Sequence, residues 1–294
     1  MSPLLGGIDL DLVAVDLRGP FEIVDLTRGG RPTARPAPSR PRPAGADIAA
    51  TTTPPRPDAR PVQHVVATLV TDDPDRSAAR WLTATERDVA SRRGARGRAA
   101  HVAGRVAAKQ AIRSHLGELG FAEFDADRIQ ITNDELGCPA VAIRGARVAT
   151  RHLRVSIAHS GGVAVAVAGQ VPPGHRRGVG PAAGIGIDVE PVEPRSPRFE
   201  RLTLGAAEQA LRPVAGDDRD TWLTRLWAAK EAAAKATGRG LEGRPKAFAA
   251  TAVAGARLLV ADRWIATEII SCGGVDHVHA TTDAHRTEFA WHRS

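Results

Sequence analysis

The sequence contains no tyrosine, a single methionine, two cysteines and only 4% aromatic residues in 294 positions. Cys138 and Cys272 are far apart and have no neighbours at metal-ligand spacing, so we expect neither a disulfide framework nor a structural zinc site. No apolar run approaches the roughly 18 residues that a membrane-spanning helix needs. We therefore expect a globular cytoplasmic protein without a membrane segment.

Lysine is also scarce. Of the 40 basic residues, 36 are arginine and four are lysine, namely Lys109, Lys230, Lys235 and Lys246. In so skewed a composition each lysine is informative, because ammonium and guanidinium groups offer different geometry to an oxyanion. The net charge of +7 and a basic stretch over residues 86–113 favour an acidic partner. Nucleic acid, a polyphosphate ligand and an acidic protein all fit this charge.

The chain divides into three parts by composition. Residues 1–61 are predicted to be an N-terminal tail and a linker, because 28–61 holds nine of the 21 prolines together with many arginines. The remainder is expected to form an N-terminal half over 62–170 and a C-terminal half over 171–294. Strands are predicted at 65–70 and 184–190, a hairpin at 154–168, and helices at 98–117 and 222–237.

The two predicted helices share a short internal repeat. Five of twelve positions match when residues 106–117 are laid over residues 227–238. Each copy follows a predicted strand by about 40 residues. The sequence therefore predicts an α/β (α+β) fold with two similar halves. Each half would pack a helix on a small, mainly antiparallel sheet, with the active site at their interface.

Two acids alternate along the predicted strand at 184–190. Asp188 and Glu190 are expected on one face, while Ile187 and Val189 point into a core. Neighbouring carboxylates repel each other unless water, a cation or a proton intervenes. Taken alone, this pattern is more typical of a solvated strand end.

The second helix changes that interpretation. Trp227, Glu231 and Lys235 recur at i, i+4 and i+8, along one edge of the helix. Glu231 follows Asp188 by 43 residues, so a third acid could join the strand pair. Three carboxylates with phosphate and water oxygens would suit an octahedral Mg²⁺.

At this point the sequence resembles the two-domain, surfactin-synthetase-activating class of 4′-phosphopantetheinyl transferases. That family carries a strand G-[IV]-D-x-E and, 40 to 45 residues later, a helix W-x-x-K-E-x-x-x-K. Here these motifs are Gly186 to Glu190 and Trp227 to Lys235. Weaker matches extend the resemblance over residues 62–292. The turn at 133–139 departs from the family pattern because Cys138 replaces a lysine, and Ala158 replaces a serine in S-x-S-H-S.

The resemblance implies an enzyme that moves phosphopantetheine from coenzyme A to a serine of an acidic apo carrier protein, releasing 3′,5′-ADP. Asp188, Glu190 and Glu231 would hold Mg²⁺, and Glu231 would act as the general base. Lys235, with Lys230 beside it, would grip the pyrophosphate. A further basic set would contact the adenosine phosphates of coenzyme A: Arg98, Arg105, Lys109 and His159. A monomer is expected, because one chain supplies both halves.

A basic nucleic-acid-binding protein is the alternative, although the basic stretch lacks interleaved aromatic residues for base stacking. Residues 238–243 spell G-x-G-x-x-G but follow a helix, so a dinucleotide site is not expected. His277 and His279 are explained by strand alternation, without a metal. The carrier could serve fatty-acid, polyketide or peptide synthesis.

Overall fold

The computed structural model describes residues 62–70, 73–121, 125–145, 152–171, 184–282 and 286–292. The predicted tail and linker at 1–61 lie outside these residues. The helices are α1 (Pro74–Trp81), α2 (Ala84–Ser91), α3 (Ala95–Glu118), α4 (Pro197–Thr203), α5 (Ala206–Ala215) and α6 (Arg219–Thr237). Two short 3-10 helices are η1 (Ala126–Arg128) and η2 (Pro245–Ala247). Within the described part of the chain, no helix is both long and apolar enough to span a membrane.

The strands form two main sheets and one separate hairpin. Strands β11 (Arg286–His292), β1 (Val62–Leu69), β5 (Val163–Gln170) and β4 (Leu153–Ser160) make the first sheet, in that order. The second sheet has the order β6 (Ile187–Pro191), β10 (Val275–Thr282), β9 (Arg263–Cys272), β8 (Arg257–Val260) and β7 (Ala250–Ala254). Strands β2 (Ile129–Asn133) and β3 (Pro139–Ile143) form the separate hairpin.

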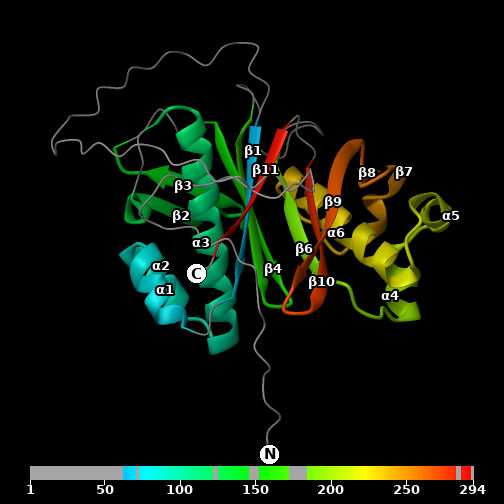
Figure 1. Cartoon of the computed structure of the whole chain (residues 1–294), viewed down its shortest axis with the longest axis horizontal. Helices are drawn as coiled ribbons and strands as arrows, with labels where there is room; N and C mark the ends of the chain where they lie inside the picture. The colour runs from blue at the N-terminus through cyan, green and yellow to red at the C-terminus, as the bar shows by residue number, and fades with distance from the viewer. Residues whose placement is uncertain are drawn as a thin grey trace, which may run out of the picture.

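The predicted fold class is confirmed. Only the β1–β11 pair is parallel among the described strands, and the other pairs are antiparallel. Helix α3 packs on the first sheet and α6 on the second, and the sheets meet through β4, β5 and β6. Figure 1 shows the resulting order of helix, sheet, sheet and helix across the molecule. Strand β11, from the predicted C-terminal half, lies in the first sheet beside β1.

Local signals explain where helix α6 begins and ends. Helix α6 starts three residues before the predicted position, because the Asp218 carboxylate accepts hydrogen bonds from the first backbone N–H groups. It ends where expected, at Gly238, whose φ of 77° is readily adopted only by glycine. Helix α3 likewise begins early, after Gly94, and extends to Glu118.

The sheet register fixes which side chains face α6. Ile187 and Val189 belong to the core between the two sheets, as the alternation predicted. Their neighbour in the sheet, β10, places Val278 and Ala280 in the core beneath α6. Asp188 pairs with Ala280, and Glu190 with Val278. Because paired residues share a face of the sheet, both acids are directed to the side that α6 covers.

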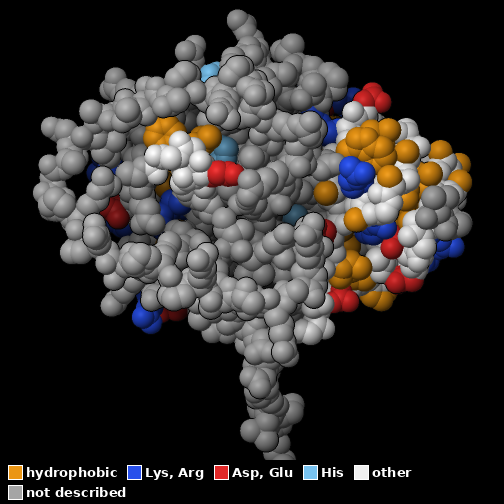
Figure 2. All heavy atoms as spheres, turned by 45° about the horizontal axis from the view of Figure 1, so that its top comes forward, with side chains coloured by type: hydrophobic (Ala, Val, Ile, Leu, Met, Phe, Trp, Pro, Cys, Tyr) orange, Lys and Arg blue, Asp and Glu red, His pale blue; other side chains and the backbone are white. Residues whose placement is uncertain are grey.

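The second sheet carries exposed apolar side chains on both of its faces. Trp264 and Ile269 of β9 are 36% and 54% exposed, and the Arg257 guanidinium lies 5.6 Å from the centre of the Trp264 ring. Figure 2 shows hydrophobic side chains interspersed with basic ones on the part of the molecule at the right. Arginine covers part of this apolar surface, as expected for a cation over an indole ring.

His279 lies in the inter-sheet core, paired with Val189 and 2% exposed. Burial lowers the pKa of His279 from 6.5 to about 4. Between pH 6.5 and about pH 4, His279 is therefore protonated in the unfolded chain but stays neutral in the folded chain. The free energy of unfolding falls as the pH drops through this range. This shift corresponds to about 3 kcal/mol at pH 4.

We predict that His279→Leu reduces this acid sensitivity. Urea unfolding at pH 7.5 and pH 4.5 gives the loss of unfolding free energy on acidification, which we expect to be smaller in the variant than in the wild type. Comparing the two pH values within each protein removes any effect of the substitution on packing. An equal loss in both proteins would contradict a proton-linked role for His279.

Candidate active site

A close approach of backbone to backbone builds the site. The residues just before β6 run directly along α6, so that a Cβ atom on Gly184 would lie 1.6 Å from the Ala236 carbonyl oxygen. A Cβ atom on Gly186 would lie 1.9 Å from the Ala232 carbonyl oxygen. Only glycine fits at these two positions, and the small alanines of α6 form the facing surface. The glycines of the strand motif therefore bring Asp188 against the helix that carries Glu231 and Lys235.

Asp188 is the most deeply buried acid of the predicted trio. Its Oδ1 atom accepts a hydrogen bond of 2.7 Å from Lys235 Nζ, while its buried Oδ2 atom has no hydrogen-bond partner. Burial raises the pKa of Asp188 from 3.8 to about 7; Lys235 opposes this rise, and Glu190 and Glu231 add to it. The side chain is thus an under-neutralised carboxylate in a site short of positive charge.

Glu190 and Glu231 both lie close enough to Asp188 to raise its pKa. Glu190 accepts hydrogen bonds from Trp227 Nε1 at 3.3 Å and from Ser160 Oγ at 3.3 Å, and Arg195 lies 3.5 Å from it. Burial raises the pKa of Glu231, with Lys235 opposing and Glu190 reinforcing the shift. The predicted edge of Trp227, Glu231 and Lys235 is therefore directed at the acids of β6.

The three acids are near neighbours, but they do not form a closed cage. Within the described ranges, no group of three or more His, Cys, Asp or Glu side chains is arranged to hold a metal ion. Lys235 supplies the counter-charge to Asp188 instead. The chemistry of the set nevertheless fits a hard divalent cation, because all its donors are carboxylate oxygens and Asp188 Oδ2 lacks a partner.

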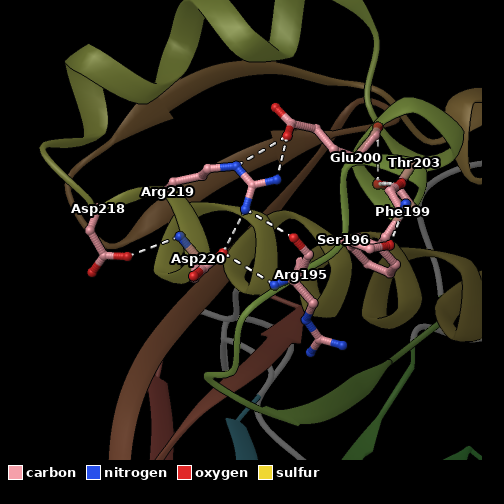
Figure 3. A network of polar contacts seen from close by, with 8 residues as sticks. All are labelled: Arg195, Ser196, Phe199, Glu200, Thr203, Asp218, Arg219 and Asp220. Carbon is pink, nitrogen blue, oxygen red and sulfur yellow. Dashed lines mark hydrogen bonds and ion pairs between the residues drawn. The ribbon is translucent and has the colours of Figure 1, made fainter.

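A network at the start of α6 holds the segment that follows β6 (Figure 3). Arg219 donates two hydrogen bonds to Glu200 Oε2, at 2.7 and 3.2 Å, and one to the Arg195 carbonyl oxygen at 3.0 Å. The Arg195 backbone N–H donates to Asp220. The Arg195 guanidinium also lies 5.1 Å from the Phe199 ring centre. These contacts hold Arg195 beside Glu190. Asp188 is bound by Lys235 of α6, and Glu190 is linked to α6 through Arg195.

A cavity of about 340 Å³ opens beside Lys235, between the two halves. The first half contributes Arg105 of α3, the turn between β2 and β3, and the start of β4. The second half contributes Gly184, Ile185 and the last turn of α6. Four basic residues line it: Arg105, Arg154, Lys235 and Arg239. None of the described lining residues is acidic, so the cavity suits a polyanion.

Further basic groups extend from this cavity along α3 and β4. Burial lowers the pKa of His101 to about 4, and Arg105, Arg93 and His159 lower it further. Burial also lowers the pKa of His159, and Lys235 and Arg93 act in the same direction. The protonated form of each imidazole is thus disfavoured by its positive neighbours. A bound anion would relieve that repulsion.

The structure brings together only part of the predicted set for coenzyme A. Arg105 and Lys235 line the cavity, and His159 lies near them at the exposed end of β4. Arg98 instead pairs with Asp75 of α1. Lys109 and Lys230 are fully buried, and their ammonium groups bind Glu86 and Glu208. Neither ammonium group reaches solvent or lines the cavity, so the structure does not bring these two lysines together with Arg105 and Lys235.

Sequence reasoning missed several residues of the cavity. Arg239 is exposed, lines the cavity and has no ion pair within the described residues. It was missed because it lies in the glycine-rich turn after α6, outside the helix motif. Arg154 was also missed, since it belongs to no recognised pattern, and so was His101, which lies near Arg105 outside the cavity lining. Cys138 donates a 3.2 Å hydrogen bond to the Gly238 carbonyl oxygen and so joins the turn of the first half to the end of α6.

Comparison with known proteins gives a family match within the second half of the chain. Residues 184–271 match the model of the 4′-phosphopantetheinyl transferase superfamily. No curated protein sequence matches the chain. The superfamily segment contains the three acids and both lysines of α6, whereas Arg105, His101 and His159 lie outside it.

Solved structures of carrier-protein synthases show a distant likeness. The chain is 19% identical to the Helicobacter pylori holo-(acyl-carrier-protein) synthase in complex with coenzyme A, covering 36% of this chain and 96% of that one, with a TM-score of 0.30. With the ACPS–CoA complex of Chronobacterium ammoniagenes the sequence identity is 21%, the match covers 38% of this chain and 96% of that one, and the TM-score is 0.31. With the holo-ACP-synthase from Plasmodium yoelii the sequence identity is 20%, the match covers 37% of this chain and 91% of that one, and the TM-score is 0.30. Scores this low support no conclusion by themselves.

We predict that Asp188→Asn stabilises the cation-free protein. The folded state holds the Asp188 proton up to about pH 7, whereas the unfolded state releases it near pH 3.8. The buried charge therefore destabilises the folded state increasingly as pH rises, by up to about 4 kcal/mol above pH 7. The variant should melt at a higher temperature than the wild type at pH 8 with chelator, and the gain should shrink at pH 5.

Glu190→Gln is the matched control, because Glu190 is half-buried and already bound by Trp227, Ser160 and Arg195. It should show no such gain at pH 8. A melting temperature of Asp188→Asn at or below that of the wild type under both conditions would contradict this account of the buried carboxylate.

Proposed function

We propose that this protein is a magnesium-dependent phosphopantetheinyl transferase that modifies a serine of an acyl or peptidyl carrier protein. The observation that carries the proposal is the position of Lys235. This residue lines the cationic cavity and also binds Asp188 at 2.7 Å, so the acids and the polyanion site share one boundary. The superfamily match over residues 184–271 supports the same assignment.

Coenzyme A fits the cavity by its charges. Its pyrophosphate and 3′-phosphate are polyanionic, and the basic residues Arg105, Arg154, Lys235 and Arg239 face the cavity from both halves. His101 lies near Arg105, and His159 lies near Lys235; burial and these cations lower the pKa of both imidazoles, so each would meet a phosphate as a neutral N–H donor. Because one chain supplies both walls, the proposed site is complete in a monomer.

The acids Asp188, Glu190 and Glu231 would hold Mg²⁺ at the boundary between the cavity and α6. The ion would neutralise charge on the pyrophosphate and on the leaving group. In this arrangement the Lys235 ammonium group would leave Asp188 and bind the phosphates instead. There it would counter the negative charge that develops as the P–O bond of the pyrophosphate breaks.

The reaction joins the carrier serine to the β-phosphorus of coenzyme A. The serine Oγ forms the new P–O bond while the bond from the β-phosphorus to the bridging oxygen breaks, and 3′,5′-ADP leaves with that electron pair. Glu231 would take the serine proton, directly or through water. Its raised pKa brings the carboxylate closer to the range of an effective general base.

We predict that Asp188→Ala and Glu231→Gln each abolish loading of purified apo carriers. Incubation with coenzyme A, Mg²⁺ and a panel of apo acyl and peptidyl carriers, followed by mass spectrometry, measures the attached phosphopantetheine. Glu268→Gln, at an exposed position of β9, is the control and should load normally. Full loading by either site variant, or the absence of loading by the wild type on every carrier, would overturn the assignment.

We also predict that Arg239→Ala weakens coenzyme A binding. Loss of one charge-assisted contact to phosphate should raise KM for coenzyme A about tenfold, with little change in kcat. Arg244→Ala is the matched control, since Arg244 is exposed nearby and pairs with Glu242 outside the cavity. Initial rates at varied coenzyme A measure both constants. Equal KM values for the two variants would exclude Arg239 from the binding site.

A further inference from the structure

Lys109 of α3 and Lys230 of α6 occupy equivalent places in the two halves. Each is the fourth residue of the twelve-residue repeat, and each is fully buried. A lysine is almost never fully buried unless its charge is paired. Two of the four lysines of the chain are therefore buried at equivalent positions, where each needs a partner for its charge.

The first-half node consists of Lys109 and Glu86. Lys109 Nζ donates to Glu86 Oε2 at 2.6 Å and to the carbonyl oxygen of Trp81, the last residue of α1, at 2.8 Å. Glu86 Oε2 also accepts from the Thr83 backbone N–H, in a capping box at the start of α2. Glu86 Oε1 accepts from the Ile131 backbone N–H of β2 at 2.9 Å.

The second-half node consists of Lys230 and Glu208, and it repeats each of these contacts. Lys230 Nζ donates to Glu208 Oε2 at 2.9 Å and to the carbonyl oxygen of Thr203, the last residue of α4, at 2.6 Å. Glu208 Oε2 accepts from the Gly205 backbone N–H at the start of α5. Glu208 Oε1 accepts from the Ala250 backbone N–H of β7 at 2.9 Å.

Each node ties a long helix to three other elements at one point. The end of one short helix, the start of the next and a strand all converge on a single buried ammonium–carboxylate pair. Burying both charges is costly, and their best-attested benefit is to specify one arrangement over its alternatives. Because side chains on a helix follow at about 100° per residue, fixing one lysine fixes the direction of its neighbours.

The neighbours differ between the halves. Arg105, one turn before Lys109, donates a 2.8 Å hydrogen bond to Asn133 and lines the cavity. Glu231 follows Lys230 directly, and Lys235 lies five residues on. The same device thus supports a binding wall in one half and the acid–lysine set in the other.

We propose that the two nodes are positioning devices with separate duties. The first-half node sets Arg105 for binding coenzyme A, and the second-half node sets Glu231 and Lys235 for the transfer step. This inference rests on the proposed function. It assigns Lys230 and Lys109 to positioning, with no contact to the substrate.

The test compares two matched double variants, Lys109→Met with Glu86→Gln and Lys230→Met with Glu208→Gln. Each removes one buried charge pair while keeping side-chain size, so the two should lose similar thermal stability. Steady-state loading is measured at a temperature where both variants are folded, with coenzyme A and Mg²⁺ varied in turn. Near-ultraviolet circular dichroism checks the fold.

We expect a division between kinetic constants. The first-half variant should raise KM for coenzyme A about tenfold or more with kcat nearly unchanged. The second-half variant should lower kcat about 10- to 100-fold at saturating coenzyme A and raise the Mg²⁺ concentration needed for half-maximal rate. If both variants change KM and kcat alike, the nodes serve stability alone and the proposal is wrong.

If a double variant does not fold, the single substitutions Glu86→Gln and Glu208→Gln replace it. The amide keeps the size of the side chain and can still accept the strand N–H, while its hold on the lysine weakens. The same division of KM and kcat is expected, at smaller size. A wild-type protein that binds coenzyme A but loads no carrier would count against the proposed function; an active wild type whose variants show no division would count against the nodes alone.

Discussion

The close contact between the residues just before β6 and the backbone of α6 is the constraint on which the site depends. Gly184 and Gly186 lie against the carbonyl oxygens of Ala236 and Ala232, at distances where any Cβ atom would overlap. The register of β6 on β10 then directs Asp188 and Glu190 to α6. Without this contact, Glu231 and Lys235 would be separated from the strand acids by a layer of side chains.

That contact concentrates negative charge in a poorly solvated place. Asp188 is 5% exposed, with one oxygen bound by Lys235 and the other unpartnered. Such a site costs stability in the free protein, which is a common property of functional centres. The adjoining cavity has the opposite charge, supplied by arginines from both halves. Lys235 belongs to both regions, and it couples an acid site to an anion site.

The two halves use the same supporting chemistry for different ends. Each long helix is anchored by a buried lysine–glutamate pair that caps a short helix and holds a strand N–H. The residue directly after the buried lysine is an acid in the second half alone, since Gln110 stands in the first half where Glu231 stands in the second. One architecture therefore carries a basic wall on one side and an acidic centre on the other.

The sequence alone determined the local features. Alternation placed Ile187 and Val189 in a core, the spacing of Trp227, Glu231 and Lys235 set one edge of a helix, and Gly238 ended it, because each of these follows from the backbone period of one element. Tertiary structure decided which cations reach the cavity. Lys109 and Lys230 match a ligand-binding pattern, yet each is turned inward by a glutamate more than twenty residues away in the chain. Arg239 enters the cavity because the end of α6 meets the turn of the other half. Such pairings depend on long-range packing, which no local period encodes.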